Sequence, residues 1–336
     1  MSVKKRRIKL PPWVFGLAGA ALWFVIGVIG VAALRSGGSD IEPKEFPPRF
    51  SVDAPVPDGL ELDTALLKRS FMYADIESLS PDDTLLAKNG GEVPPAKLQP
   101  VFNAVFSKDG LQIASLKDSR LKCRAEAIVP LSEMLDGFYN ATGLRTIMIN
   151  AAYEPDASAA AGKCAEHNNG YSFDFGIYLK DSDRRTAFTI ESDYRWFAAH
   201  AWEYGFVQRY PQGSEELTGV AARDDHFRYV GRVAARILTE NSLCFEQLDE
   251  FMRGHTIDDP LVLNDGGSYV VVYYHKLDES RKVPVPATKE GEPLPCEAYY
   301  IGKDRKAVIA AVRPTVEFFT EAKAPTEPDL DLDIDG

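Results

Sequence analysis

Two histidines and one aspartate are the residues of this chain best suited to chemistry. His167 and Asp174 lie in the run Glu-His-Asn-Asn-Gly-Tyr-Ser-Phe-Asp, and His226 opens the run His-Phe-Arg-Tyr-Val-Gly. Two imidazoles and one carboxylate suit a catalytic Zn²⁺, which takes three protein ligands and leaves a fourth position open. Such a zinc activates water for attack on an amide at neutral pH. By spacing alone a second interpretation stays open, in which each histidine is a satisfied polar residue.

Two extended segments must position these residues. Residues 171–179 alternate as a strand does, which places Asp174 on one face and the neighbouring phenylalanines on the other. His167 precedes this strand across Asn-Asn-Gly, a turn sequence that can return the imidazole over the strand. His226 begins a second strand-like run. Nothing local indicates that the two segments are neighbours.

The rest of the chain alternates between helical and extended patterns. Apolar residues recur at helical spacing in three segments, which predicts helices over 125–139, 194–204 and 230–238. Apolar, aromatic and β-branched residues predict strands over 144–151, 268–274, 282–287 and 307–312. The sequence pattern changes at about residue 255, after which residues that favour β-strands predominate. We therefore expect a main domain over 61–254 and a small β-rich appendage over 255–320.

Charge separates a basic N-terminal segment from an acidic body. The net charge is −12, and the first 34 residues contribute +5, so the rest of the chain carries about −17. Residues 13–34 carry no charge and are long enough for a bilayer core of ~30 Å. The basic segment 1–12 precedes them, so the positive-inside rule places the N-terminus in the cytoplasm and the following chain outside. We expect a single-pass transmembrane anchor, with a cleaved signal peptide as the alternative.

The linker and the tail follow from composition. Residues 35–60 are rich in glycine and proline, which is typical of a stalk linker. Residues 321–336 are acidic and are predicted to be disordered. An acidic body also argues against nucleic acid as a partner. The sequence does not determine the oligomeric state.

Four cysteines are spread along the part expected outside the cell. An even count permits disulfides there, and four cysteines allow three pairings among which the sequence does not choose. Buried free thiols are the alternative. No Cys-x-x-Cys spacing is present, so a structural zinc site on cysteines is not expected. The residues are Cys123, Cys164, Cys244 and Cys296.

Three ordered runs resemble the VanY-type zinc D-alanyl-D-alanine carboxypeptidases, within the group that includes lysostaphin-type and hedgehog-type metallo domains. The family run Ser-x-His-x-x-Gly-x-Ala-x-Asp aligns with residues 165–174. Its Tyr-Gly-Phe-x-x-Arg-Tyr-Pro stands at 204–211. Its Thr-Gly, followed shortly by Glu-Pro-Trp-His-Phe-Arg-Tyr-Val-Gly, aligns with 218–231. The resemblance covers roughly residues 120–250.

The resemblance implies a fold, a cofactor and an activity. The fold is α+β, an antiparallel sheet with flanking helices that carries the zinc site. Zn²⁺ is held by His167, Asp174 and His226. The implied activity is removal of D-alanine from peptidoglycan stem peptides by a membrane-anchored, extracytoplasmic carboxypeptidase.

The chain departs from the family at the positions that catalyse and bind. The family's glutamate, which polarises water and moves its proton, is Arg223 here, and a guanidinium cannot act as a base. The family's arginine for the substrate carboxylate is Glu154, its tryptophan beside the second histidine is Asp225, and its first serine is Ala165. Two arrangements are open: Glu154 and Arg223 pair across the cleft, or both face solvent.

Three functions remain in view. One is a cell-surface scaffold built on the β-rich appendage, which only the acidic tail favours, and the other two concern the metal site. In the first of these two, Asp224 replaces the missing base, and Arg209 or Arg228 holds the substrate carboxylate. In the second, the chain is a catalytically degenerate relative, a pseudoenzyme that binds the cell wall or a protein partner. The residue at position 223 separates them.

Overall fold

The structure is a computed structural model that describes residues 59–80, 85–86, 93–155, 165–265, 268–302 and 304–321. The predicted basic segment, anchor and almost all of the predicted stalk and tail lie outside these residues. Among the helices within them, none is both long and apolar enough to cross a membrane.

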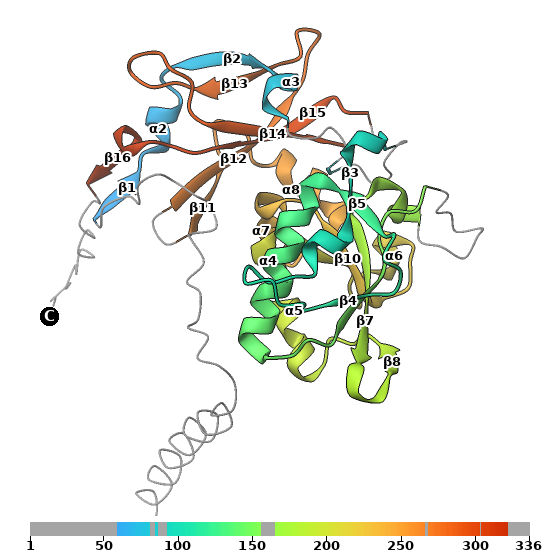
Figure 1. Cartoon of the computed structure of the whole chain (residues 1–336). Helices are drawn as coiled ribbons and strands as arrows, with labels where there is room; N and C mark the ends of the chain where they lie inside the picture. The colour runs from blue at the N-terminus through green and yellow to red at the C-terminus, as the bar shows by residue number, and fades with distance from the viewer. Residues whose placement is uncertain are drawn as a thin grey trace, which may run out of the picture. The chain divides into compact units, whose positions relative to one another are not determined.

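A six-stranded sheet carries the sequence motifs (Figure 1). β4 and β6 pair in parallel, and the other neighbours in this sheet are antiparallel. The predicted α+β class is confirmed, with one parallel pair in the sheet that was expected to be antiparallel. In spatial order the strands are β4 (Ser115–Leu116), β6 (Ile147–Ala151), β7 (Ser172–Leu179), β10 (Arg223–Tyr229) and β9 (Phe206–Tyr210), with β8 (Arg184–Ala187) beside β7.

Helices pack against this sheet through apolar faces. α4 buries Leu131, Leu135 and Phe138 at helical spacing, and these side chains share a core with the strand residue Phe175. The predicted helices over 125–139 and 230–238 are confirmed, whereas the one over 194–204 is an α-helix followed by a 3₁₀ turn, η7 (Ala201–Tyr204). The α-helices are α4 (Ala125–Thr142), α5 (Arg195–His200), α6 (Glu215–Thr218), α7 (Arg232–Glu240) and α8 (Leu248–Arg253).

The C-terminal β-rich segment is built around a four-stranded antiparallel sheet. Successive residues of its central strand β12 point to opposite faces, as the two-residue period requires. Val270 and Val272 join the core of the main domain, while Val271 and Tyr273 join a second core. The β-rich prediction is confirmed, but the segment shares a core with the main domain. In order the strands are β11 (Leu261–Asp265), β12 (Ser268–Lys276), β15 (Ala307–Val312) and β14 (Cys296–Ile301).

The second core joins residues 60–79 to strands near the C-terminal end of the described chain. Residues 60–79 pair with strands from the far end of the chain, and Leu67 and Ile76 are buried among them. This stretch, predicted as the start of the main domain, therefore pairs and packs with the C-terminal strands. The elements are β1 (Leu60–Leu62) with β16 (Phe319–Glu321), β2 (Phe71–Asp75) with β13 (Lys282–Pro286), α2 (Thr64–Leu67) and α3 (Ile76–Leu79).

Short elements complete the described chain. One more pair of strands, β3 (Leu98–Pro100) and β5 (Lys122–Arg124), precedes α4. Single 3₁₀ turns join the larger elements: η1 (Pro95–Lys97), η2 (Val101–Ala104), η4 (Ala165–Asn169), η5 (Lys180–Ser182), η6 (Ser192–Tyr194), η8 (Phe245–Gln247) and η9 (Val316–Phe318).

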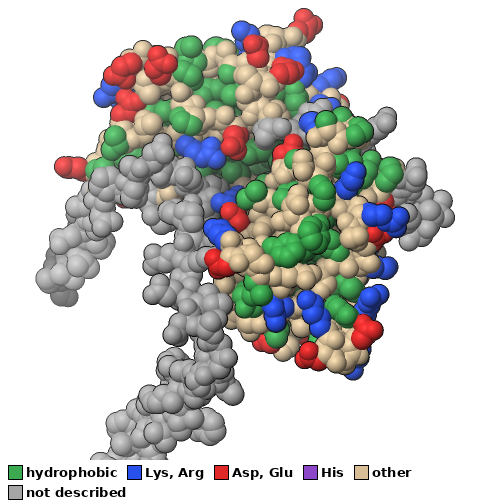
Figure 2. All heavy atoms as spheres, in the orientation of Figure 1, with side chains coloured by type: hydrophobic (Ala, Val, Ile, Leu, Met, Phe, Trp, Pro, Cys, Tyr) green, Lys and Arg blue, Asp and Glu red, His purple; other side chains and the backbone are tan. Residues whose placement is uncertain are grey.

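The surface mixes charge with apolar side chains. On the face drawn in Figure 2, basic and acidic side chains are interspersed, with hydrophobic ones between them. The exposed apolar residues include Met72 and Tyr73 on β2, at 45% and 64% exposure. Exposed ion pairs contribute little to stability, so the two buried cores carry most of it.

The cysteines give no disulfide among the described residues. Cys123, Cys244 and Cys296 are free thiols in this structure, so no two of these three are paired with each other. Burial raises the pKa of the Cys123 thiol well above its usual range. Cys164 lies outside the described residues.

Gly205, in the Tyr-Gly-Phe run, permits the close approach of β9 and β10. Its φ is +85°, and a Cβ there would lie 2.7 Å from a ring carbon of Tyr229 and 3.0 Å from the backbone of Gly231. Gly213 has nearly the same φ, +86°, with nothing within 4 Å of such a Cβ. The two positions therefore separate backbone strain from crowding.

We predict that Gly205→Ala lowers the free energy of unfolding by roughly 2–5 kcal/mol, because strain and crowding add. Gly213→Ala, with strain alone, should cost about 1–2 kcal/mol. Urea unfolding followed by circular dichroism measures both. Equal losses would show that the approach at Gly205 is not tight.

Candidate metal centre

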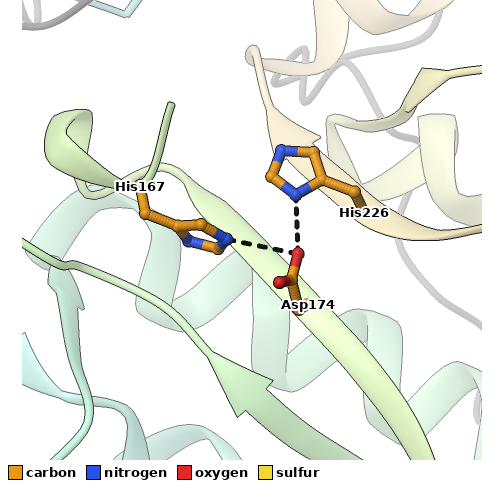
Figure 3. A group of neighbouring side chains, drawn as sticks. All are labelled: His167, Asp174 and His226. Carbon is orange, nitrogen blue, oxygen red and sulfur yellow. Dashed lines mark hydrogen bonds and ion pairs between the residues drawn. The ribbon is translucent and has the colours of Figure 1, made fainter. Parts of the chain in front are cut away.

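The structure brings the three predicted metal ligands together (Figure 3). One carboxylate oxygen of Asp174, Oδ1, lies 2.6 Å from His226 Nδ1 and 3.2 Å from His167 Nε2. The two imidazole rings are nearly perpendicular, with centroids 5.0 Å apart. Side chains 52 residues apart in sequence therefore converge on one point.

Strand register explains half of this convergence. β7 and β10 pair antiparallel with His226 directly opposite Asp174. Directly opposed residues of such a pair project to the same face, with Cβ atoms ~4.5–5.5 Å apart. The sequence indicated two strands but not that they pair. The register supplies what spacing alone could not.

The turn before β7 explains the other half. His167 lies in the 3₁₀ turn η4, and Asn169 Oδ1 accepts the Tyr171 N–H at 2.6 Å, which closes a local Asx turn. Gly170 then takes φ +77°, where a Cβ would lie 3.0 Å from the Arg124 side chain. The expected return of the imidazole over the strand is confirmed.

Burial shows that these side chains form a prepared site. His167 is 2% exposed and His226 is 0% exposed. His167 Nε2 has Asp174 Oδ1 as an ion-pair partner at 3.2 Å, but neither ring nitrogen makes a hydrogen bond, although both are buried. Buried polar atoms are nearly always hydrogen-bonded, so a ring nitrogen that faces a carboxylate in this way suits a metal ion between the two.

The donor set fits zinc in type and in spacing. One ligand atom from each of His167, Asp174 and His226 lies within 4.8 Å of the others. Ligands 2.0–2.2 Å from a tetrahedral zinc are roughly 3.3–3.6 Å apart, so small side-chain shifts suffice. Burial alone raises the pKa of Asp174, but the neighbouring imidazoles outweigh burial and hold this pKa far below its usual range. The carboxylate is therefore ready to bind a cation.

Glu166 supports the site from behind. Its Oε2 lies 3.7 Å from His226 Nε2, the ring nitrogen that points away from Asp174. Metal-binding histidines commonly direct their second nitrogen to a carboxylate, which fixes the ring. The Tyr210 ring also stacks on His226, with centroids 5.1 Å apart. With Nε2 and the ring held in this way, His226 Nδ1 faces Asp174 and the predicted metal position.

Glu166 also holds two buried arginines. Its Oε1 accepts from Arg209 Nε at 2.8 Å and from Arg228 Nη1 at 3.0 Å, and Glu246 takes the remaining edge of Arg209. Burial alone raises the pKa of Glu166. The Arg228 charge and the His226 contact outweigh burial and lower this pKa to about 2. The carboxylate thus stays ionised and keeps the network intact.

This network bears on the cations predicted to hold the substrate carboxylate. Arg209 is 1% exposed and Arg228 is 0% exposed. Both are paired with acids inside the protein, and neither lines the open pocket described below. The geometry therefore does not support that role for either residue.

Arg223 takes carboxylate partners other than the predicted one. Its Nε and Nη2 donate to the two oxygens of Asp225, each at 2.9 Å, and Nη2 lies 3.0 Å from Asp174 Oδ2. These contacts stand in place of the predicted pair with Glu154. Hydrogen bonds to Asp225, outweighing burial, raise the pKa of Arg223 further above its usual range. A permanent cation therefore touches a predicted metal ligand.

An open pocket of about 800 Å³ lies beside Asp174. Asp224, the predicted base, is exposed and lines it, and Asp224 Oδ2 accepts the Ile190 N–H at 3.2 Å. Lys117, which follows β4, and Arg185 of β8 line the same pocket.

Sequence reasoning missed Glu166 and Asp225. Both are neighbours of predicted ligands in the chain, but residue type does not reveal burial or partners. One signal was present for Glu166: two arginines inside strands need a buried acid, because unpaired buried charge is very costly. For Asp225 no signal beyond its nearness to Arg223 was available.

Comparisons with known proteins agree with the motifs. Residues 147–232 match the family model "VanY: D-alanyl-D-alanine carboxypeptidase". The chain is 26% identical over 184 residues to a D-alanyl-D-alanine carboxypeptidase of Enterococcus faecium, covering 51% of this chain and 57% of that protein. It is 28% identical over 153 residues to the putative carboxypeptidase YodJ of Bacillus subtilis (strain 168), covering 46% and 50%. The chain thus spans about half the length of these curated relatives.

Two solved structures are similar to part of the chain at lower identity. The vancomycin resistance D,D-dipeptidase VanXYg, solved with a D-Ala-D-Ala phosphinate analog, is 18% identical with a TM-score of 0.49, covering 65% of this chain and 98% of that chain. A variant of the D,D-pentapeptidase VanY, solved in complex with Zn(II), is 22% identical with a TM-score of 0.31, covering 40% and 86%.

We predict that Glu166→Gln lowers the free energy of unfolding of the metal-free chain by roughly 3–5 kcal/mol, because it removes the buried charge that both Arg209 and Arg228 contact. Glu133→Gln is the matched control. Glu133 pairs with Arg232 at 2.7 Å, but these side chains are 27% and 34% exposed. Its loss should be below about 1 kcal/mol. A loss at Glu166 as small as at Glu133, in urea unfolding, would contradict the prediction.

Proposed function

We propose, from the premise that residues 147–232 form a divergent VanY-type domain, that this chain is a zinc-dependent carboxypeptidase that removes D-alanine from peptidoglycan stem peptides. The observation that carries the proposal is the convergence of His167, Asp174 and His226 beside an open pocket. Family resemblance alone does not require that convergence in a chain this divergent. The ligand positions are kept where other family positions have changed.

The residues of the site have separable roles. His167 Nε2, Asp174 Oδ1 and His226 Nδ1 would hold the zinc ion, and Glu166 would orient His226 through its second nitrogen. Zinc bound there supplies Lewis acidity and activates water for attack on an amide. Burial of the two histidines keeps competing water away from their far sides.

The role of general base is assigned to Asp224. Arg223 stands at the family's glutamate position and cannot accept a proton. Asp224 lines the same pocket as Asp174, and the Ile190 N–H fixes one of its oxygens. The other oxygen is available to take a proton from the attacking water. This assignment rests on position in the pocket and on the carboxylate's chemistry.

The substrate's terminal carboxylate needs a cation in the pocket. Lys117 and Arg185 line it without a carboxylate partner among the described residues, and Arg185 lies over the Tyr178 ring at 5.6 Å. We assign the carboxylate to these two cations in place of Arg209 and Arg228. Charge complementarity of this kind determines how the substrate is positioned in the pocket more than how tightly it binds.

The location of the enzyme is part of the proposal. The uncharged run 13–34, preceded by basic residues, supports a single-pass anchor with the catalytic domain outside the cytoplasm. An extracytoplasmic position would give the domain access to peptidoglycan.

Binding without turnover is the second candidate function. One observation favours it: Arg223 contacts Asp174, and its guanidinium cannot act as a general base. The relatives found by comparison bear carboxypeptidase names, so turnover is the first candidate. In the second, the pocket would bind a cell-wall peptide or a protein partner.

We predict that the purified full-length chain, supplied with zinc, releases D-alanine from a stem pentapeptide ending in D-Ala-D-Ala. His226→Ala should abolish release, because one of three ligands is lost. A pentapeptide ending in L-Ala-L-Ala is the matched substrate control and should not be cleaved. No release by a chain shown to be folded would contradict turnover and favour the binding function.

We also predict that Arg223→Glu raises kcat for D-alanine release at least tenfold. It restores a carboxylate base at the family position, and general base catalysis contributes roughly 10²–10⁴-fold. Arg223→Gln, which removes the cation without adding a base, separates the two effects. If the glutamate variant is no faster than the original chain, position 223 is not the missing base.

A further inference from the structure

Asp174 divides its two oxygens between different partners. Oδ1 lies 2.6 Å from His226 Nδ1 and 3.2 Å from His167 Nε2, and it is the oxygen that faces the proposed zinc position. Oδ2 lies 3.0 Å from Arg223 Nη2. One edge of the predicted metal ligand is therefore already occupied by a fixed positive charge.

Arg223 is held in this position by a second acid. Asp225 accepts from Nε and Nη2 in a two-point contact, with both distances 2.9 Å. Such forked pairs fix the orientation of the guanidinium plane as well as its position. The Arg223 side chain is 28% exposed, so water screens it only in part. The register of β10 against β9 shifts between Arg223 and Phe227, which sets this stretch apart from the regular strand.

We propose that Arg223 competes with the metal ion for Asp174 and thereby lowers the zinc affinity of the site. A divalent ion and a guanidinium that share one carboxylate repel each other, and this repulsion is weakly screened at a half-buried position. Asp225 limits the competition, because it offers Arg223 another partner. This inference rests on the proposed zinc site, and it concerns affinity, whereas the proposed function concerns turnover.

The charge balance of the pocket points the same way. Its lining carries three acids, Asp174, Asp224 and Asp225, and three cations, Lys117, Arg185 and Arg223. Removing one cation leaves an unbalanced acid, which favours a divalent ion. Arg223 is the cation that touches a ligand, whereas Arg185 contacts the Tyr178 ring. Position, more than net charge, should therefore decide the effect.

The test is zinc affinity, measured by competition with a chromogenic chelator on the purified full-length chain. Arg223→Met keeps the length of the side chain and removes its charge. It should bind zinc at least about tenfold tighter than the original chain. Arg185→Met, which removes an equal charge from the same pocket, should change the affinity by less than about threefold. Near-equal gains in both variants would overturn the proposal in favour of net charge alone.

Asp225→Asn provides a second, independent test. Without Asp225, Arg223 has only Asp174 to pair with, so the original chain should lose zinc affinity. In the Arg223→Met background the same change should have much less effect, since no guanidinium is left to redirect. Coupling of this kind is what a double-mutant cycle detects. Equal losses in both backgrounds would mean that Asp225 acts only through its own charge, which overturns the proposal.

The outcomes separate this inference from the proposed function. Zinc bound with unchanged affinity in Arg223→Met overturns the competition and leaves the zinc enzyme standing. Zinc bound by Arg223→Met but not by the original chain supports the competition in its strongest form. Zinc bound by none of the variants overturns both the competition and the zinc site.

Discussion

The antiparallel register of β7 and β10 is the constraint on which the site depends. It sets His226 opposite Asp174 and Arg228 opposite Ser172. Side chains alternate between faces along a strand, so a slip of one residue would turn His226 and Arg228 away together. The ligand pair and the buried ion network therefore form or fail as a unit. The turn that returns His167 only completes what the register begins.

Glu166 connects the stability of the fold to the geometry of the site. It is the acid that makes two buried arginines tolerable, and it also lies behind His226. Buried charges stabilise little in net terms, but removing one partner is costly. Such a network specifies an arrangement more than it adds free energy. The network includes Glu246 in η8, so it links the segment that follows α7 to Glu166 and His226.

The sequence predicted the parts of the site that follow from local pattern and family resemblance. The cluster of His167, Asp174 and His226, the β7 strand and helix α4 belong to this group. It did not predict the pairing of residues 60–79 with the C-terminal strands, because such contacts join segments more than two hundred positions apart. It also misjudged Arg209 and Arg228, whose residue type suggests a solvent-facing cation while their strand positions bury them. The partners of Arg223 depend on side-chain geometry that no spacing rule contains.

The most direct test of the metal centre is the zinc K-edge X-ray absorption spectrum of the zinc-loaded full-length chain. We predict nitrogen and oxygen ligands at about 2.0–2.2 Å with scattering from two imidazoles. His167→Ala should reduce the imidazole count to one. Sulfur scattering at about 2.3 Å, or a shell without imidazole, would contradict a zinc site on His167, Asp174 and His226.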